Sequence, residues 1–365
     1  MIKSFCQHAL LVFFGIGTVV VALEVFGRLL PADSLPGALP VIAQAMRLDA
    51  GMFYRRDAYF RHTTGANLDL LIQHRDFIYR VKTKLNLGEV GFRGGTRGGP
   101  VWGVAVGDSL TFGIGVDQDA TWVAQLTDLL GLEILNLGVP GWGPQQYTRA
   151  IERYSTTLKP KTIFYGLYKN DLQDVLIFDK WLRADGYLRR VESFLRRTSI
   201  SFNLCRLMWN DFIPPSDTIY FDGSGLELDS DQLKKSLTAE RNSFHSAWSL
   251  VKPEIEQAMH YSESIGANFI LLYFPSKLEA YWNLIRRKDI SLEPFDDSVE
   301  IFSKQVANFC RTRQISCLDL TPPLRTRAAQ EVNLYFAHDL HWTETGNRVV
   351  ATEIYNFLTA QGIPQ

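Results

Sequence analysis

The stretch VWGVAVGDSLTFG occupies residues 101–113 and joins an apolar run to a polar, glycine-flanked serine turn. The run Val101–Val106 has the length and composition of a buried strand. The turn at Ser109 is either an ordinary strand-to-helix connection or a platform that holds a nucleophilic hydroxyl. The choice between the two depends on which polar groups follow the other strands of the same sheet.

The sequence after residue 100 alternates between strand-like and helix-like patterns. Apolar runs of strand length lie at 101–106, 132–136, 161–167, 267–273 and 315–319. Helical periodicity fits 120–130, 144–158, 232–265, 296–312 and 345–361. This alternation predicts a parallel sheet covered by helices on both faces. Functional groups in such sheets gather at the carboxyl ends of the strands.

The N-terminus has a different composition. No charge occurs in Ala9–Leu23, and a helix that continues to residue 30 is long enough for a bilayer core of about 30 Å. Glu24 and Arg28, four residues apart, share one helix face, and Lys3 favours a cytoplasmic N-terminus. We predict a retained signal anchor over residues 1–30, with a cleaved signal peptide and an interfacial or buried helix as the alternatives. Either of the first two places the rest of the chain outside the cytoplasm.

The remaining chain divides into two parts. Residues 31–99 are interpreted as a linker and an N-terminal extension, with one strand within 77–84. Residues 100–365 form the predicted catalytic domain, interrupted by an insertion at about 172–230 that is rich in Arg, Asp, Phe and Trp. The insertion separates the third and fourth predicted strands, where it could form a lid or a substrate wall.

The composition argues against nucleic-acid binding and against a disulfide-stabilised fold. With 46% apolar residues, 21% charged residues and a net charge of −1, the chain has a globular composition and no basic field for nucleic acid. Four cysteines without a C-x-x-C pair give little support to a disulfide framework. A bridge between Cys310 and Cys317 stays open, with buried thiols as the default.

Three polar blocks follow the serine turn in sequence order. They are Asn136–Gly141 after the second strand, Tyr168–Asp171 after the third, and His338–Asn347 before the last helix. Together with GDSLTFG, these blocks resemble the motifs of the SGNH, or GDSL-type, hydrolases over roughly residues 100–360. The resemblance implies a three-layer α/β/α sandwich with a flavodoxin-like, parallel, five-stranded sheet.

The resemblance also implies a role for each matched residue. Ser109 is the predicted nucleophile, His341 the base that takes its proton, and Asp339 the carboxylate that orients the imidazole. The backbone amides of Ser109 and Gly138 and the side-chain amide of Asn170 are the predicted oxyanion-hole donors. No cofactor and no metal is implied. A metal site at His338, Asp339 and His341 lacks a further ligand from a distant part of the chain.

Two departures from the common family pattern bear on the reaction. Tyr168 stands where the G-x-N-D block usually has glycine, and the acid–base spacing is D-x-H instead of D-x-x-H. The pattern Asp339-Leu340-His341-Trp342 also resembles that of SGNH-like O-acetyltransferases that modify bacterial exopolysaccharides. We therefore predict an extracytoplasmic serine esterase acting on an ester-bearing substrate, with an O-acylated polysaccharide among the candidates. A membrane-tethered O-acetyltransferase and a catalytically inactive SGNH-like binding module are the alternatives.

Overall fold

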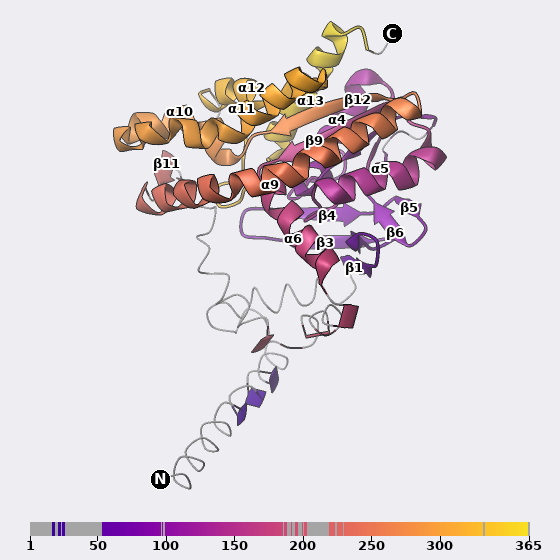
Figure 1. Cartoon of the computed structure of the whole chain (residues 1–365), viewed down its shortest axis with the longest axis horizontal. Helices are drawn as coiled ribbons and strands as arrows, with labels where there is room; N and C mark the ends of the chain where they lie inside the picture. The colour runs from indigo at the N-terminus through magenta and orange to yellow at the C-terminus, as the bar shows by residue number, and fades with distance from the viewer. Residues whose placement is uncertain are drawn as a thin grey trace. The chain divides into compact units, whose positions relative to one another are not determined.

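The structure is a computed structural model of the whole chain (Figure 1). It describes residues 53–184 except 96 and 98, residues 219–363 except 223, 224, 229, 331 and 332, and scattered residues between 17 and 25 and between 186 and 202. The chain divides into two compact units. One comprises Met1–Arg55 with Arg183–Pro214, and the other comprises Arg56–Leu182 with Pro215–Gln365.

A five-stranded parallel sheet forms the centre of the larger unit. Its strands are β7 (Val101–Val106), β8 (Glu133–Asn136), β9 (Thr162–Tyr168), β12 (Asn268–Phe274) and β13 (Ser316–Asp319). The strand order β13-β12-β9-β7-β8 is the flavodoxin-like order, and every neighbouring pair is parallel. The predicted sheet is therefore confirmed, with each strand within one residue of its expected position.

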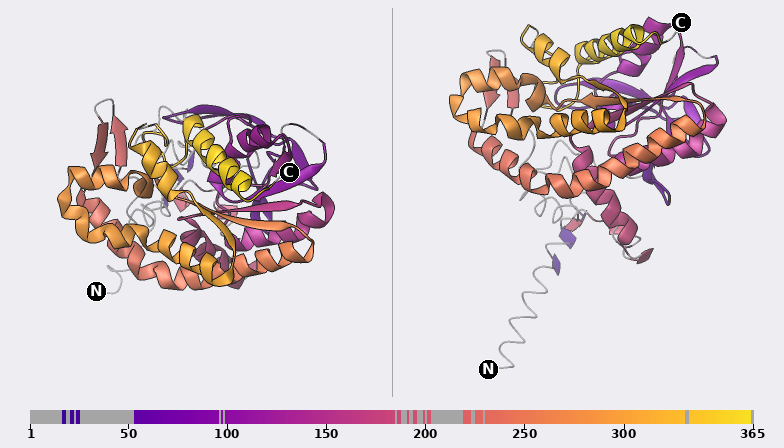
Figure 2. Two further views of the ribbon diagram at one scale, coloured as in Figure 1. Left: turned by 90° about the horizontal axis from the view of Figure 1, so that it is seen from above. Right: turned by 45° about the horizontal axis from the view of Figure 1, so that its top comes forward.

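Helices cover both faces of this sheet (Figures 1 and 2). One face carries α5 (Pro144–Leu158), α9 (Ser230–Ser264) and most of the buried side of α11 (Asp296–Arg313). The opposite face carries α4 (Trp122–Leu130), α10 (Lys277–Lys288), α12 (Thr321–Ala328) and α13 (Glu344–Ala360). The three-layer α/β/α sandwich follows from the strands being apolar on both sides.

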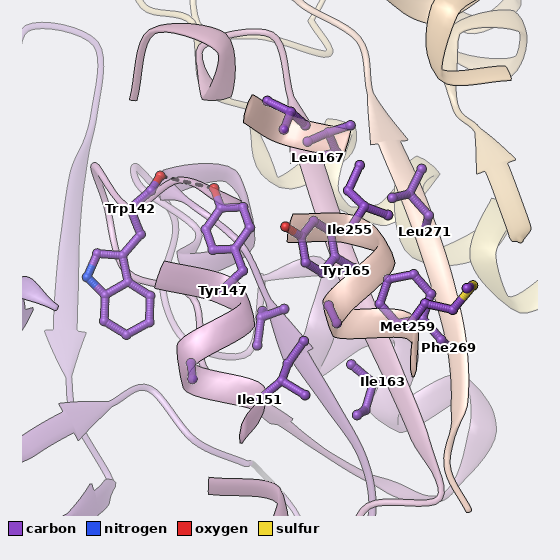
Figure 3. Packing of buried hydrophobic residues seen from close by; sticks show 14 of the residues in the cluster. Trp142, Tyr147, Ile151, Ile163, Tyr165, Leu167, Ile255, Met259, Phe269 and Leu271 are labelled. Atoms are coloured by element: carbon purple, nitrogen blue, oxygen red, sulfur yellow. Dashed lines mark hydrogen bonds between the residues drawn. The ribbon is translucent and has the colours of Figure 1, made fainter. Parts of the chain in front are cut away.

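The alternation of side chains along β9 illustrates how the two cores form. Ile163, Tyr165 and Leu167 belong to the cluster under α5 and α9, whereas Phe164 belongs to the cluster on the other face. Figure 3 shows the first cluster, in which the Tyr147 hydroxyl oxygen also lies 3.0 Å from the backbone oxygen of Trp142. Both cores are therefore packed against the same central strands.

The N-terminal extension consists of short strands. They are β1 (Tyr54–Asp57), β2 (Arg61–Thr64), β3 (Asp69–Gln73), β4 (Ile78–Lys82), β5 (Leu85–Leu87) and β6 (Val90–Phe92). The strand predicted within 77–84 is β4, which pairs antiparallel with β3. Phe60, Val90 and Phe92 are buried in the same core cluster as α5. These extension residues therefore pack on the sheet domain.

Several elements were not predicted from the sequence. The region interpreted as an insertion begins with a helix, α6 (Asp171–Arg183), and ends with the hairpin β10 (Ile219–Asp222) and β11 (Gly225–Leu228). The short elements α3 (Ser109–Phe112) and η3 (Ile290–Phe295), together with α10 and α12, were also missed. The short lengths of α3, η3 and α12 leave little periodicity to detect.

The predicted anchor, residues 1–30, lies largely outside the described residues. None of the helices in the described part of the chain combines the length and apolar character of a membrane-spanning helix. Within the smaller unit, a carboxylate oxygen of Glu24 accepts hydrogen bonds from the Ser199 hydroxyl at 2.7 Å and from the Ser201 amide at 3.1 Å. Cys310 and Cys317 of the larger unit are free thiols.

Candidate active site

Ser109 opens the one-turn helix α3, three residues beyond the end of the interior strand β7. Asp108 caps this helix, because one carboxylate oxygen accepts from the backbone amide of Leu110 at 2.9 Å. The other oxygen, Oδ2, accepts from the Ser109 hydroxyl at 3.2 Å. At the end of the turn, Gly113 adopts a left-handed conformation with φ of 84°. The predicted nucleophile is thus held at the carboxyl edge of the sheet and is partly exposed.

Gly138 lies in the loop after β8 and packs against α3. A Cβ atom at this position would come within 2.4 Å of the Phe112 amide nitrogen, so only glycine allows this close approach. Asn136 ties the two segments together, since its side chain donates to the Thr111 carbonyl oxygen at 2.7 Å and accepts from the Gly138 amide at 3.0 Å. The predicted oxyanion donor therefore lies beside the serine helix, with its amide bonded to Asn136.

Asn170 follows β9, the neighbour of β7 in the sheet. Its side-chain nitrogen donates to Asp108 Oδ2 at 3.1 Å, the same oxygen that accepts from the Ser109 hydroxyl. An amide nitrogen carries two hydrogens, so one is left for a developing oxyanion. Asp171 holds this loop by accepting from the Tyr168 amide at 2.8 Å. The asparagine and the serine are thus brought together although tyrosine replaces the usual glycine.

Asp339 and His341 form a hydrogen-bonded pair in the loop before α13. The imidazole Nδ1 lies 2.5 Å from Asp339 Oδ1, and the same oxygen accepts from the His341 amide at 2.8 Å. Burial acts to raise the pKa of Asp339, but the bonds and charge of His341 outweigh it and leave this pKa below its usual value. The carboxylate therefore stays ionised and can fix the imidazole orientation.

The two halves of the predicted site are linked electrostatically. Burial raises the pKa of Asp108, and the nearby charge of His341 partly offsets this effect. Among the interactions of the described residues, no hydrogen bond joins the Ser109 hydroxyl to His341; the hydroxyl donates to Asp108 instead. Catalytic hydrogen bonds are often long or misaligned without substrate. The catalytic roles of Ser109, Asp339 and His341 stay predictions.

Asp108, next to the serine, interacts electrostatically with two further aspartates; Asp108 and Asp171 are buried and Asp174 is half-buried. Burial raises the pKa of Asp108, of Asp171 and of Asp174, and the charge of Asp108 raises the pKa of Asp171 and of Asp174 further. For Asp174 the pKa rises to about 7, while Arg61 acts in the opposite direction. Asp171 is stabilised by the hydroxyl of Tyr147, which donates to it at 2.6 Å. The protonation of Asp174 is therefore coupled to folding near neutral pH.

Replacing Asp174 by asparagine is expected to stabilise the protein more at pH 8 than at pH 5, by on the order of 2 kcal/mol. The folded-state pKa of about 7 lies above the ordinary 3.8, so ionisation of this group costs stability as the pH rises between these values. The asparagine variant has no such ionisation. Thermal unfolding of variant and parent at both pH values measures the effect, and an equal difference at both would contradict it.

The other residues considered in the sequence analysis form pairs or lie in the core. His338 pairs with Asp76, and no group of three or more metal-ligating side chains occurs among the residues the structure describes. Trp142 and Trp342, which adjoin the motifs, are buried in the core and do not line a cleft. Two residues that the sequence analysis missed, Asp76 and Lys277, contact the loop that carries the acid and the base. Neither has a motif that would have identified it.

A flavodoxin-like sheet with a serine after its first strand and an Asp–His pair before its last helix is the arrangement that the resemblance to SGNH hydrolases implies. Residues 250–365 match the family model described as an SGNH hydrolase-like domain, acetyltransferase AlgX. The predicted resemblance to SGNH hydrolases and their acetyltransferase relatives is thereby confirmed. The match includes Asp339 and His341. It begins at residue 250 and therefore does not include Ser109, Gly138 or Asn170. An ester-acting enzyme, either an acyl esterase or an acetyltransferase, is the function class that this finding supports.

Solved structures of GDSL-type proteins are distantly similar. A putative lipolytic protein of the G-D-S-L family from Desulfitobacterium hafniense is 12% identical, covers 71% of this chain and 99% of its own, and has a TM-score of 0.38. TesA is 12% identical, covers 71% of this chain and 98% of its own, and has a TM-score of 0.39. A mutant of the acetylxylan esterase Axe2 from Geobacillus stearothermophilus is 11% identical. It covers 72% of this chain and 95% of its own, with a TM-score of 0.39. No curated protein sequence matches the chain.

Proposed function

We propose that this protein cleaves an acyl ester through a covalent acyl-enzyme on Ser109. The observation that supports the proposal is that Ser109 and the loop with Asp339 and His341 both lie near the carboxyl ends of strands of one sheet. Ser109 follows β7, and the loop with Asp339 and His341 is bonded to Lys277, three residues beyond the end of β12. β7 and β12 flank β9 in the sheet, and Asn170 lies in the turn just after β9.

The first chemical step is attack of the Ser109 oxygen on the carbonyl carbon of the ester. The hydroxyl proton passes to Nε2 of His341, whose Nδ1 donates to Asp339. Collapse of the tetrahedral intermediate breaks the bond to the alcohol oxygen, which leaves with the proton from His341. In the second step, water gives its proton to His341 and attacks the acyl carbon. The bond between this carbon and the Ser109 oxygen then breaks, the serine oxygen takes the proton back from His341, and the acid is released.

The oxyanion of each intermediate needs donors that are already in place. The Ser109 amide, the second hydrogen of the Asn170 side chain and the Gly138 amide supply them, the last after exchanging its bond with Asn136. In serine hydrolases, one such donor contributes on the order of 3 kcal/mol to lowering the barrier. The tie between Asn136 and α3 keeps these donors close to the serine.

The family model favours a second candidate, an O-acetyltransferase. Its description names an acetyltransferase and its match includes the Asp339–Trp342 segment. The acyl-enzyme is the same, but a sugar hydroxyl replaces water as the group that attacks the acyl carbon. The two reactions therefore share every residue above and differ in the acceptor.

Incubation of the full-length chain with p-nitrophenyl acetate, with and without an oligosaccharide acceptor, separates the two reactions. Esterase activity releases acetate in proportion to p-nitrophenol whether or not the acceptor is present. Acetyl transfer places acetyl groups on the oligosaccharide, seen by mass spectrometry, and leaves little free acetate. Transfer as the main outcome would replace the esterase proposal by the second candidate, and release of neither product would contradict both.

We further propose that residues 1–30 anchor the chain in a membrane and that the domain from residue 100 onward acts outside the cytoplasm. Support comes from the uncharged run Ala9–Leu23 and from Lys3 on its N-terminal side. Extraction of membranes with alkaline carbonate should leave the full-length chain in the membrane pellet. Release of the chain into the supernatant without detergent would contradict the anchor.

A further inference from the structure

The loop Phe336–His341, which carries the predicted acid and base, is held by two residues outside the motifs. One is Asp76, in the turn between β3 and β4 of the N-terminal extension; the other is Lys277, at the start of α10. The loop itself is closed by a backbone hydrogen bond from Phe336 to the carbonyl oxygen of His341 at 3.0 Å. The His338 amide and the carbonyl oxygens of Phe336, Ala337 and Asp339 bond to residues distant in sequence.

Asp76 binds His338 through the backbone amide and the imidazole Nδ1. Its Oδ2 accepts from the His338 amide at 2.5 Å, and its Oδ1 lies 2.8 Å from the imidazole Nδ1. The aspartate side chain is only 8% exposed, so solvent screens this pairing weakly. The ring of Phe77, the next residue, packs on Phe336 with centroids 4.6 Å apart. The hairpin turn therefore contacts both ends of the segment that precedes Asp339.

Lys277 holds the same loop from the sheet side. Its buried ammonium group donates to the carbonyl oxygens of Phe336 at 2.9 Å, Ala337 at 2.8 Å and Asp339 at 3.4 Å. An ammonium group has three hydrogens, which matches three carbonyl acceptors. Lys277 comes directly after the Ser276 cap of α10, so the end of β12 determines its place. The backbone of Asp339 is thus tied to the sheet.

We propose that Asp76 is a positioning residue of the active site, which acts through His338 to fix the loop that carries Asp339 and His341. This inference rests on the proposed function. Under this proposal, the β3–β4 turn of the N-terminal extension helps to position the catalytic residues. A displacement of about 1 Å in a catalytic group can cost on the order of 10²-fold in rate, so this contact controls how well the imidazole reaches Ser109.

The test is a double-mutant cycle with p-nitrophenyl acetate on the full-length chain. We expect Asp76→Asn to lower kcat by on the order of 10-fold to 100-fold with KM within about twofold, because the group acts on the chemical step. His338→Gln should cause a similar loss. The double variant should lose no more than the single variants, because both remove the same contact. Labelling of Ser109 by a fluorophosphonate should slow in parallel.

Asp69→Asn is the matched control. Asp69 lies on β3 of the same hairpin and pairs with Arg80, with both side chains largely exposed, so its loss should leave kcat unchanged. Parent-like kcat in Asp76→Asn, or multiplying losses in the double variant, would overturn the positioning role. A Ser109→Ala variant assayed in parallel keeps the two proposals apart. If it is inactive while Asp76→Asn is unaffected, only the positioning role fails; if it is active, the proposed function fails and the positioning role with it.

Discussion

Replacing Ser109 by alanine is expected to abolish fluorophosphonate labelling and to lower kcat for p-nitrophenyl acetate by a factor on the order of 10⁴–10⁶. The Ser109 oxygen forms the bond to the acyl carbon in the acyl-enzyme, and alanine has no oxygen that could form this bond. The remaining rate reflects only binding and the oxyanion donors. Mass spectrometry of the labelled protein and steady-state kinetics provide the two measurements.

The control for this variant is Ser249→Ala. Ser249 is an exposed residue of α9 whose hydroxyl donates to its own helix, so its loss should change neither labelling nor rate. Unchanged labelling in Ser109→Ala would remove the nucleophile assignment. It would also favour the third hypothesis from the sequence, an SGNH-like binding module without catalysis.

Replacing Asp339 by asparagine is expected to lower kcat by a factor on the order of 10⁴ while leaving the fold intact. The asparagine oxygen can still accept from the His341 amide, but the side chain no longer carries the charge that stabilises a protonated imidazole. Its amide can also hold the ring in the wrong tautomer. Steady-state kinetics and thermal unfolding, measured together, separate this loss from a loss of structure.

Asp57→Asn serves as the matched control for this change. Asp57 accepts from the amides of Tyr59 and Phe60 in a local turn, a role that asparagine also performs. A parent-like kcat in Asp339→Asn would show that another group orients His341. Equal losses in both variants would point to a general effect on the fold.

Much of the fold was predictable because its signals are local. The run Val101–Val106 is β7 without any shift, since a strand buried on both faces is apolar throughout. α10 was missed although its capping box, Ser276 with Glu279, is visible in the sequence. α12 begins with two prolines after its first residue and has little amphipathic character, so its pattern gives no comparable signal.

For the candidate site, the sequence predicted the residues but not most of their contacts. The motifs in the sequence, through their resemblance to SGNH hydrolases, named the candidate residues. The contact between Asp339 and His341 could be predicted because the two are only two residues apart. The sequence by itself also determined that Ser109, Gly138 and Asn170 follow strands, because hydrophobic periodicity locates strand ends.

Only the tertiary structure decided that Asp76 binds His338 across 262 positions of sequence and that Lys277 binds the loop carbonyls. It alone also decided that the Gly138 amide bonds to Asn136 and that one Asp108 oxygen accepts from both Ser109 and Asn170. Such contacts depend on how the hairpin and loops pack against the sheet. Hydrophobic periodicity specifies the face that each element buries, but not the distant polar group that each side chain meets there.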